Sequence, residues 1–126
     1  MAADHLDLGA RGEELAGKYL RRAGYRLLAR NYRCKCGEID LVAEEGGSLV
    51  FIEVKTRSSA GFGHPLEAVD RRKQGQLIRA AHVYLREQTA EERYCRFDVV
   101  AVTFGGDGKP VVELVKNAFD LTEGQR

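Results

Sequence analysis

Two carboxylates and a lysine stand close together in the sequence, in an arrangement that could hold a divalent metal ion. Asp40 ends the segment Gly37-Glu38-Ile39-Asp40, and the triplet Glu53-Val54-Lys55 follows after a pair of glycines. Carboxylate oxygens suit Mg²⁺ and Mn²⁺, which bind through one or two carboxylates together with water and substrate phosphate. A neighbouring lysine would supply positive charge to phosphate oxygens. Asp40, Glu53 and Lys55 therefore predict a metal site that acts on phosphate esters.

These residues can act together only if the strands that carry them are paired. Side chains alternate along a strand, so Glu53 and Lys55 share a face and lie about 6.5–7 Å apart. Gly46-Gly47 predicts a tight turn between the strands. If the hairpin register sets Asp40 beside Glu53, the carboxylates converge, and a cation would offset their repulsion. The same alternation applies to the strand that carries Asp40. It sets Glu38, Asp40 and Val42 on one face and Ile39, Leu41 and Ala43 on the other. The structural alternative is that both acids end strands and Lys55 forms an ion pair with one of them.

Hydrophobic periodicity predicts the elements that position these residues. Apolar residues recur at helical spacing over 8–23, before Gly24, and again over 65–87, after a loop at 58–65. Apolar runs predict strands at 25–32, 38–45, 49–55, 97–104 and 111–115. The order αβββαββ predicts an α/β fold with a mixed central sheet flanked by helices.

The composition is that of an ordinary globular chain. With 126 residues, 44% hydrophobic and 31% charged, the chain suits one core. We expect a single domain over 1–126, with its core at about 8–117 and a flexible tail at 118–126. Apolar runs are too short to cross a membrane and the first residues show no secretory pattern, so we expect a cytoplasmic protein with no membrane partner.

Charge is unevenly distributed although the net charge is only +1. Between Leu15 and Gly37 the chain carries seven basic residues and no acidic one, which could give one face a positive potential. The residues that we expect to contact nucleic acid are Arg30, Arg33, Arg57, Lys73 and Gln74. A solvated helix face and turn is an equally open reading of this pattern. Asp98 lies in an apolar strand, and we expect it to make a structural hydrogen bond or ion pair.

An Asp, a gap across a hairpin and then Glu-x-Lys resemble the signature of PD-(D/E)xK nucleases, which have a restriction-endonuclease-like fold with an αβββαβ core. One departure is Ile39 before Asp40, where the name of the signature has proline. Further residues, spread over about 9–119, resemble the YraN family of bacterial proteins, which is similar to archaeal Holliday-junction resolvases. They are Gly12-Glu13, Ala16, Tyr19-Leu20, Gly24-Tyr25, Asn31, Gly37-Glu38-Ile39-Asp40-Leu41, Phe51-Ile52-Glu53-Val54-Lys55-Thr56-Arg57, Lys73, Ala81, Tyr84-Leu85 and Arg96-Phe97-Asp98-Val99-Val100.

The resemblance implies roles for four residues. Asp40 and Glu53 would bind Mg²⁺ or Mn²⁺, and Lys55 would be the catalytic lysine. It also points to Glu13, rather than Glu14, as a further acidic catalytic residue. Helix geometry independently favours this choice, because Glu13 flanks the apolar stripe whereas Glu14 points away from it.

The leading hypothesis is a Mg²⁺-dependent endonuclease that acts on DNA, with branched or junction DNA suggested by the family resemblance alone. A homodimer would place two sites on two strands. The second hypothesis is a non-catalytic nucleic-acid-binding module with a retained nuclease fold. The third is a protein-interaction domain whose charges are only a solvated surface.

Overall fold

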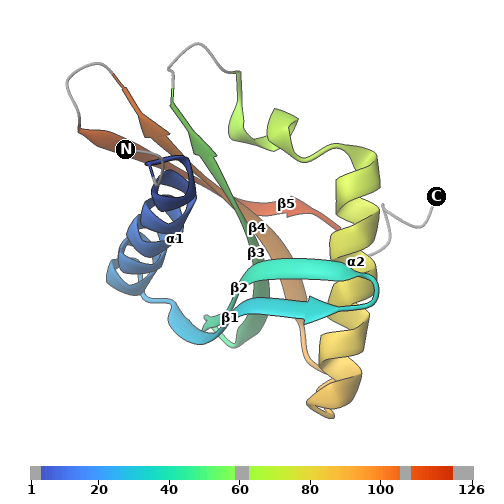
Figure 1. The fold of residues 1–126 in the computed structure, drawn as a ribbon. Coiled ribbons are helices and arrows are strands. Elements are labelled where there is room, and N and C mark those ends of the chain that lie inside the picture. Colours follow the sequence, from blue (N-terminus) through green and yellow to red (C-terminus); the bar gives the residue numbers. More distant parts are fainter. Residues whose placement is uncertain (1–3, 59–62, 106–108, 121–126) are drawn as a thin grey trace.

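The computed structural model describes residues 4–58, 63–105 and 109–120. Within these residues, two α-helices lie on opposite faces of one five-stranded sheet (Figure 1). The elements are α1 (Asp4–Arg22), β1 (Arg26–Cys34), β2 (Gly37–Glu45), β3 (Ser48–Arg57), the 3-10 helix η1 (Pro65–Ala68), α2 (Arg71–Glu87), β4 (Cys95–Phe104) and β5 (Pro110–Phe119). Strands lie in chain order; β3 and β4 are parallel and the other neighbours antiparallel. The predicted α/β class, mixed sheet and restriction-endonuclease-like core are confirmed.

Helix α1 covers one face of the sheet. Ala16 and Leu20 are fully buried, in a cluster with side chains of β2, β3 and β4. Near its start α1 approaches β3 closely, since a Cβ on Gly12 would lie 2.0 Å from Oγ1 of Thr56. The helix begins at Asp4, four residues before the predicted start, and ends before Gly24, whose φ of 96° suits glycine at a helix end. Glu13, the residue after Gly12, lies near Asp40 and Glu38 of β2 and Arg30 of β1.

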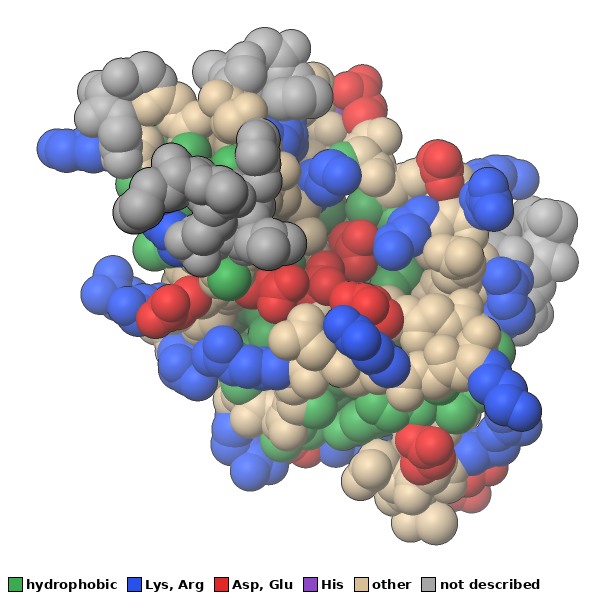
Figure 2. Space-filling view, in the orientation of Figure 1, with side chains coloured by type: hydrophobic (Ala, Val, Ile, Leu, Met, Phe, Trp, Pro, Cys, Tyr) green, Lys and Arg blue, Asp and Glu red, His purple; other side chains and the backbone are tan. Residues whose placement is uncertain are grey.

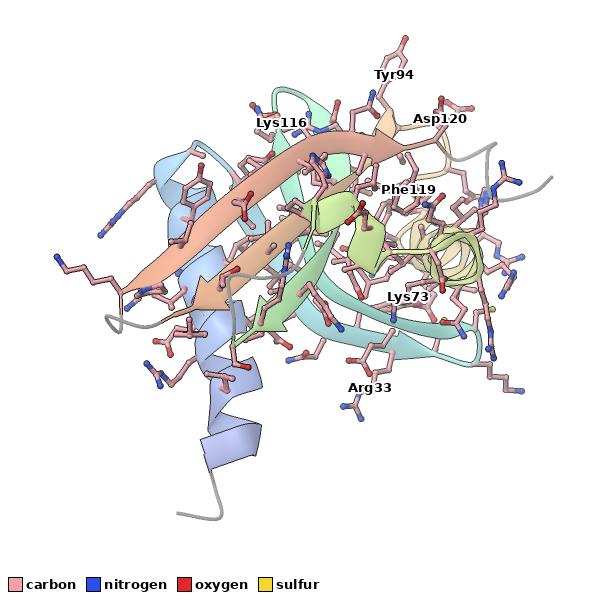
Figure 3. All side chains as sticks on the ribbon, turned by 90° about the horizontal axis from the view of Figure 1, so that it is seen from above. Arg33, Lys73, Tyr94, Lys116, Phe119 and Asp120 are labelled. Carbon is pink, nitrogen blue, oxygen red and sulfur yellow. The ribbon has the colours of Figure 1, made fainter. Side chains whose placement is uncertain are left out.

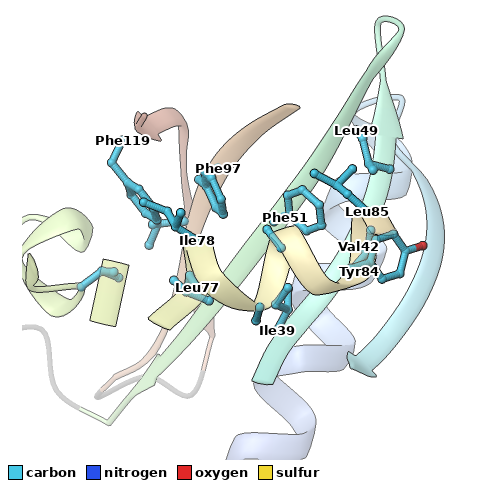
Figure 4. Close-up of a cluster of buried hydrophobic side chains, with 14 residues drawn as sticks. Ile39, Val42, Leu49, Phe51, Leu77, Ile78, Tyr84, Leu85, Phe97 and Phe119 are labelled. Carbon is cyan, nitrogen blue, oxygen red and sulfur yellow. The ribbon is translucent and has the colours of Figure 1, made fainter. Parts of the chain in front are cut away.

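Helix α2 covers the opposite face (Figure 4). Leu77, Ile78 and Leu85 pack with Phe51 and Phe97 from the central strands. The predicted single helix over 65–87 is wrong, because it is divided into η1 and α2. The physical reason is a helix cap. Asp70 has extended backbone and its carboxylate accepts the backbone N–H of Lys73 at 2.9 Å, which starts a new helix.

The last strand extends into the segment that was predicted to be a tail. Ala118 and Phe119 belong to β5, and Phe119 stacks on Phe97 with ring centroids 4.7 Å apart. Burial of this ring, 5% exposed, holds the strand end against the core. The predicted tail is therefore wrong for these two residues. Asp120 follows the strand, and residues 121–126 lie outside the described part.

The strict alternation predicted for β2 does not hold around Asp40. Ile39 and Val42 lie in the cluster beneath α2, whereas Leu41 and Ala43 lie in the cluster beneath α1. Ile39 and Leu41, expected on one face, thus contribute to opposite sides. Opposite this stretch, Asn31 in β1 has a φ of 50°, which breaks regular strand geometry between its paired neighbours.

Asp98 anchors three strands from within the sheet. Its carboxylate accepts hydrogen bonds from Arg96 Nε at 3.0 Å, from Tyr25 Oη at 2.6 Å and from the backbone N–H of Asn117 at 2.9 Å. The side chain of Asp98 is fully buried. The structural role predicted for Asp98 is confirmed, because these bonds tie the start of β1 and the end of β5 to β4.

No helix in the described ranges combines the length and the apolar character needed to cross a bilayer.

Candidate active site

Asp40 and Glu53 meet where β2 pairs with β3. Leu41 lies opposite Ile52, so Asp40 and Glu53 come next to one another at the following position of this antiparallel register. Oδ2 of Asp40 accepts the backbone N–H of Val54 at 2.8 Å, and the two carboxyl groups share a hydrogen bond. The predicted convergence of the two carboxylates is confirmed.

The environment of this pair disfavours two negative charges. Burial, followed by the charge of Asp40, raises the pKa of Glu53 to about 8, although Lys73 opposes the shift. Burial also raises the pKa of Asp40, against the stabilising hydrogen bond from Val54. Near neutral pH the pair therefore tends to carry one proton, shared between its two carboxyl groups, and one negative charge. A ligand that balances both charges would displace that proton.

Glu13 faces this pair from α1, as the helix geometry predicts. It is partly buried, and its pKa is raised first by burial and then by the negative charges of Asp40 and Glu38. Glu14 points elsewhere: its side chain is 63% exposed and lies 3.9 Å from Lys18 on the outer surface of α1. Of the two acids, Glu13 is the one that the fold places near Asp40.

Lys55 and Arg57 follow Glu53 along β3. Lys55 is exposed and lines a pocket of about 380 Å³ together with Arg57 and His64. Arg57 is buried and donates from Nη1 to the carbonyl oxygen of Gly63 at 2.9 Å, so part of its guanidinium is occupied by this contact. Lys55 is therefore presented to solvent on the strand that carries Glu53.

The lysine in an ion pair with Glu53, among the residues described, is Lys73 of α2, with Nζ 3.5 Å from Oε2 of Glu53. The structural alternative was an ion pair between Lys55 and one of the acids. In the described residues Glu53 pairs with Lys73 instead. Gln74 donates a hydrogen bond from its side-chain amide to the carbonyl oxygen of Val69 at 3.0 Å, at the start of α2. This bond uses a donor that could otherwise bind a ligand. The sequence marked Lys73 as a phosphate contact and missed its contact with Glu53.

A second pocket opens on Asp40. It measures about 350 Å³ and is lined by Arg33, Cys34, Gly37, Glu38, Asp40 and Lys73. Arg33 is exposed and lies 3.4 Å from Glu38, while Arg30 sits close enough to Glu13 to lower its pKa. Figure 2 shows acidic side chains gathered near the middle of this face, between α1 and α2, with Lys and Arg side chains around them. An anionic centre with a cationic margin suits a metal ion and a phosphate chain together.

The donor set fits a hard divalent cation held by two protein ligands. In the part of the chain that the structure describes, no three or more His, Cys, Asp or Glu side chains are grouped to hold a metal. Mg²⁺ needs no such cage, because it commonly binds through one or two carboxylates and takes water and substrate phosphate as its other ligands. Asp40 and Glu53 would supply those two carboxylates.

Comparison with known proteins places these features in a family. Residues 12–102 match the model of "Uncharacterised protein family UPF0102". A UPF0102 protein of Chlorobaculum parvum is 56% identical over 121 residues, covering 92% of this chain and 94% of its own. Those of Symbiobacterium thermophilum and Geobacter metallireducens are 49% and 46% identical, covering 89% and 96% of this chain and 95% and 98% of theirs. This is the family that the sequence motifs indicate under the name YraN, and the matched segment spans Glu13, Asp40, Glu53 and Lys55. The chain is a member of the UPF0102 family.

Proposed function

We propose that this protein is a metal-dependent nuclease that hydrolyses phosphodiester bonds in DNA. The observation that carries the proposal is the meeting of Asp40 and Glu53 on paired strands, where burial raises the pKa of both groups and the charge of Asp40 raises that of Glu53 further. Such a pair costs stability when both groups are ionised, and a divalent cation removes that cost. Ligand binding accounts for this arrangement better than a role in folding does.

In the proposed reaction Asp40 and Glu53 hold one Mg²⁺ or Mn²⁺ ion. When bound, such an ion supplies a Lewis acid to the phosphoryl oxygens and makes water more acidic. The hydrogen bond from Val54 fixes the orientation of the Asp40 carboxylate. Lys55, exposed on the same strand as Glu53, binds the phosphate and stabilises the charge that develops on it. Glu13 holds a water molecule or a proton on the α1 side of Asp40.

DNA is the proposed substrate because basic residues surround the carboxylates. Arg33 and Lys73 line the pocket that opens on Asp40, and Arg57 lines the pocket beyond Lys55. Backbone phosphates would contact these cations on both sides of the scissile bond. Cleavage of branched or junction DNA, action as a homodimer and a cytoplasmic location are further parts of the proposal that rest on the family resemblance and the sequence.

The first test is metal binding, followed by cleavage. We would titrate Mg²⁺ and Mn²⁺ by calorimetry into wild type and into an Asp40→Ala/Glu53→Ala variant. Each protein would then be offered a four-way junction and a linear duplex. A Glu91→Ala/Glu92→Ala variant is the matched control, since it removes the same charge from exposed residues. We expect metal binding and strand cleavage in wild type and control, and neither in the variant without the paired carboxylates.

Equal, weak metal binding in all three proteins and no cleavage would exclude the nuclease. Salt dependence then separates the other two hypotheses. DNA affinity that falls with rising salt would favour the non-catalytic binding module, whereas affinity that does not respond to salt would leave the protein-interaction domain.

A further inference from the structure

Lys73 occupies a defined position at the start of α2. Its backbone N–H is held by the Asp70 cap at 2.9 Å, and the side chain of Gln74 secures the preceding turn through the carbonyl oxygen of Val69. From this turn the side chain of Lys73 reaches across to β3, where Nζ lies 3.5 Å from Oε2 of Glu53. Figure 3 shows Lys73 and Arg33 at the same margin of the molecule, beside the β1–β2 hairpin.

The contact does not have the features of a structural ion pair. The side chain of Lys73 is 36% exposed, whereas that of Glu53 is 13% exposed. Helix α2 is attached to the sheet by its buried apolar side, including Leu77 and Ile78, and not by this pair. A pair whose lysine is partly exposed on a flexible stem contributes little to stability and can be exchanged readily.

The charges around Asp40 and Glu53 do not balance with Lys73 alone. Two carboxylates carry two negative charges when ionised, and one lysine balances one of them. A divalent cation balances both negative charges. Lys73 would then be a surplus positive charge, about one ion-pair distance from the metal ion. Repulsion between them is strong at such a separation. Lys73 also lines, together with Arg33, a pocket that opens to solvent and could receive its side chain.

We propose that Lys73 is an exchangeable counter-ion, which pairs with Glu53 before metal binds and turns to a DNA phosphate afterwards. This inference rests on the proposed function and adds to it that metal loading releases one phosphate-binding group. Lys73 then lies beside Arg33 in the pocket that borders Asp40, while Lys55 approaches the same site from the neighbouring pocket. Both lysines would then be available to substrate phosphate.

The test is Mn²⁺ binding without DNA, measured by calorimetry. Lys73→Met removes the counter-ion, Lys73→Arg retains its charge, and Arg72→Met removes an equal charge from the exposed neighbouring residue. We expect Lys73→Met to bind Mn²⁺ about tenfold or more tightly than wild type. The Mn²⁺ affinities of Arg72→Met and Lys73→Arg should stay within about twofold of that of wild type. This change is small beside the tenfold change expected for Lys73→Met. Thermal unfolding of each variant confirms that it is folded.

The second measurement concerns DNA and uses a background in which Lys55→Met suppresses cleavage. We would compare the junction affinity of Lys55→Met with that of Lys55→Met/Lys73→Met, in EDTA and in Mn²⁺. The loss of affinity due to Lys73→Met should be several-fold larger in Mn²⁺, because Lys73 is then available to phosphate. Opposite effects on metal and DNA affinity distinguish exchange from a structural role, which would weaken both.

Two outcomes would overturn the inference. If wild type binds Mn²⁺ through Asp40 and Glu53 but Lys73→Met binds it equally well or more weakly, Lys73 does not compete and the proposed nuclease stands without it. If folded wild type binds no Mn²⁺, the proposed function fails and the inference fails with it.

Discussion

The sheet holds two groups of charged residues that are built in opposite ways. Around Asp98, Arg96, Tyr25 and the backbone of Asn117 all donate to one buried carboxylate. At the other group, Asp40 and Glu53 share one hydrogen bond, and one partly exposed lysine contacts the pair at 3.5 Å. A satisfied carboxylate stabilises the fold, whereas two that repel one another cost stability until something binds. The comparison separates an acid that serves structure from a pair of acids that, on the proposed function, would serve a ligand.

Removing the satisfied acid should have the largest effect on stability. We expect Asp98→Ala to reduce the free energy of unfolding by about 3–5 kcal/mol, because Arg96 and the Tyr25 hydroxyl lose a buried acceptor. Urea unfolding measures this change. Glu45→Ala is the control, since Glu45 contacts the same Arg96 from the surface at 2.7 Å and its loss should matter far less. Equal losses in the two variants would contradict the structural role of Asp98.

Removing one member of the repelling pair should act in the other direction. Glu53→Gln keeps the shape of the side chain and abolishes one charge, so we expect the metal-free protein to gain on the order of 1–2 kcal/mol at pH 8. The same variant should lose Mn²⁺ binding. Urea unfolding in EDTA and calorimetry measure the two effects. A clear loss of stability in Glu53→Gln would show that Glu53 supports the fold. The carboxylate pair and the group around Asp98 would then both be structural.

The pH dependence of stability follows from the same pair. The folded pKa of Glu53 is raised above its unfolded value, so the folded state holds more protons between about pH 4.5 and pH 8. Stability of the metal-free protein must then fall as pH rises through this window. Other groups titrate there too, so the relevant quantity is the difference between wild type and Glu53→Gln, measured by unfolding at several pH values. Saturating Mn²⁺ should remove the fall in wild-type stability with rising pH. A stability difference between wild type and Glu53→Gln that does not change with pH would contradict the raised pKa of Glu53.

The sequence predicts the carboxylate pair because the hairpin turn fixes the register. Gly46 and Gly47 have φ values of 59° and 84°, the left-handed conformation of a two-residue turn, and Glu45 lies opposite Ser48. Counting back from that turn sets Asp40 beside Glu53. Local sequence therefore carries the central geometry of the site.

The features that the sequence did not predict depend on contacts between distant elements. Lys73 meets Glu53 only because α2 crosses over the sheet, and no pattern within α2 names its partner. The end of β5 is held by the stacking of Phe119 on Phe97, a residue far away in the sequence. The helix start at Asp70 was not predicted, because the apolar periodicity over 65–87 continues across the break between η1 and α2.

The smallest expected effect separates two adjacent acids in α1. Glu13 feels the charges of Asp40 and Glu38, whereas Glu14 lies 3.9 Å from Lys18 on the outer surface. If Glu13 assists the site from a second layer, Glu13→Gln should lower Mn²⁺ affinity or cleavage by about tenfold, and Glu14→Gln should change neither. The two variants differ by one position and remove the same charge, so long-range electrostatics cancel in the comparison. Equal effects would place Glu13 outside the site, and Asp40 and Glu53 would then form its whole acidic component.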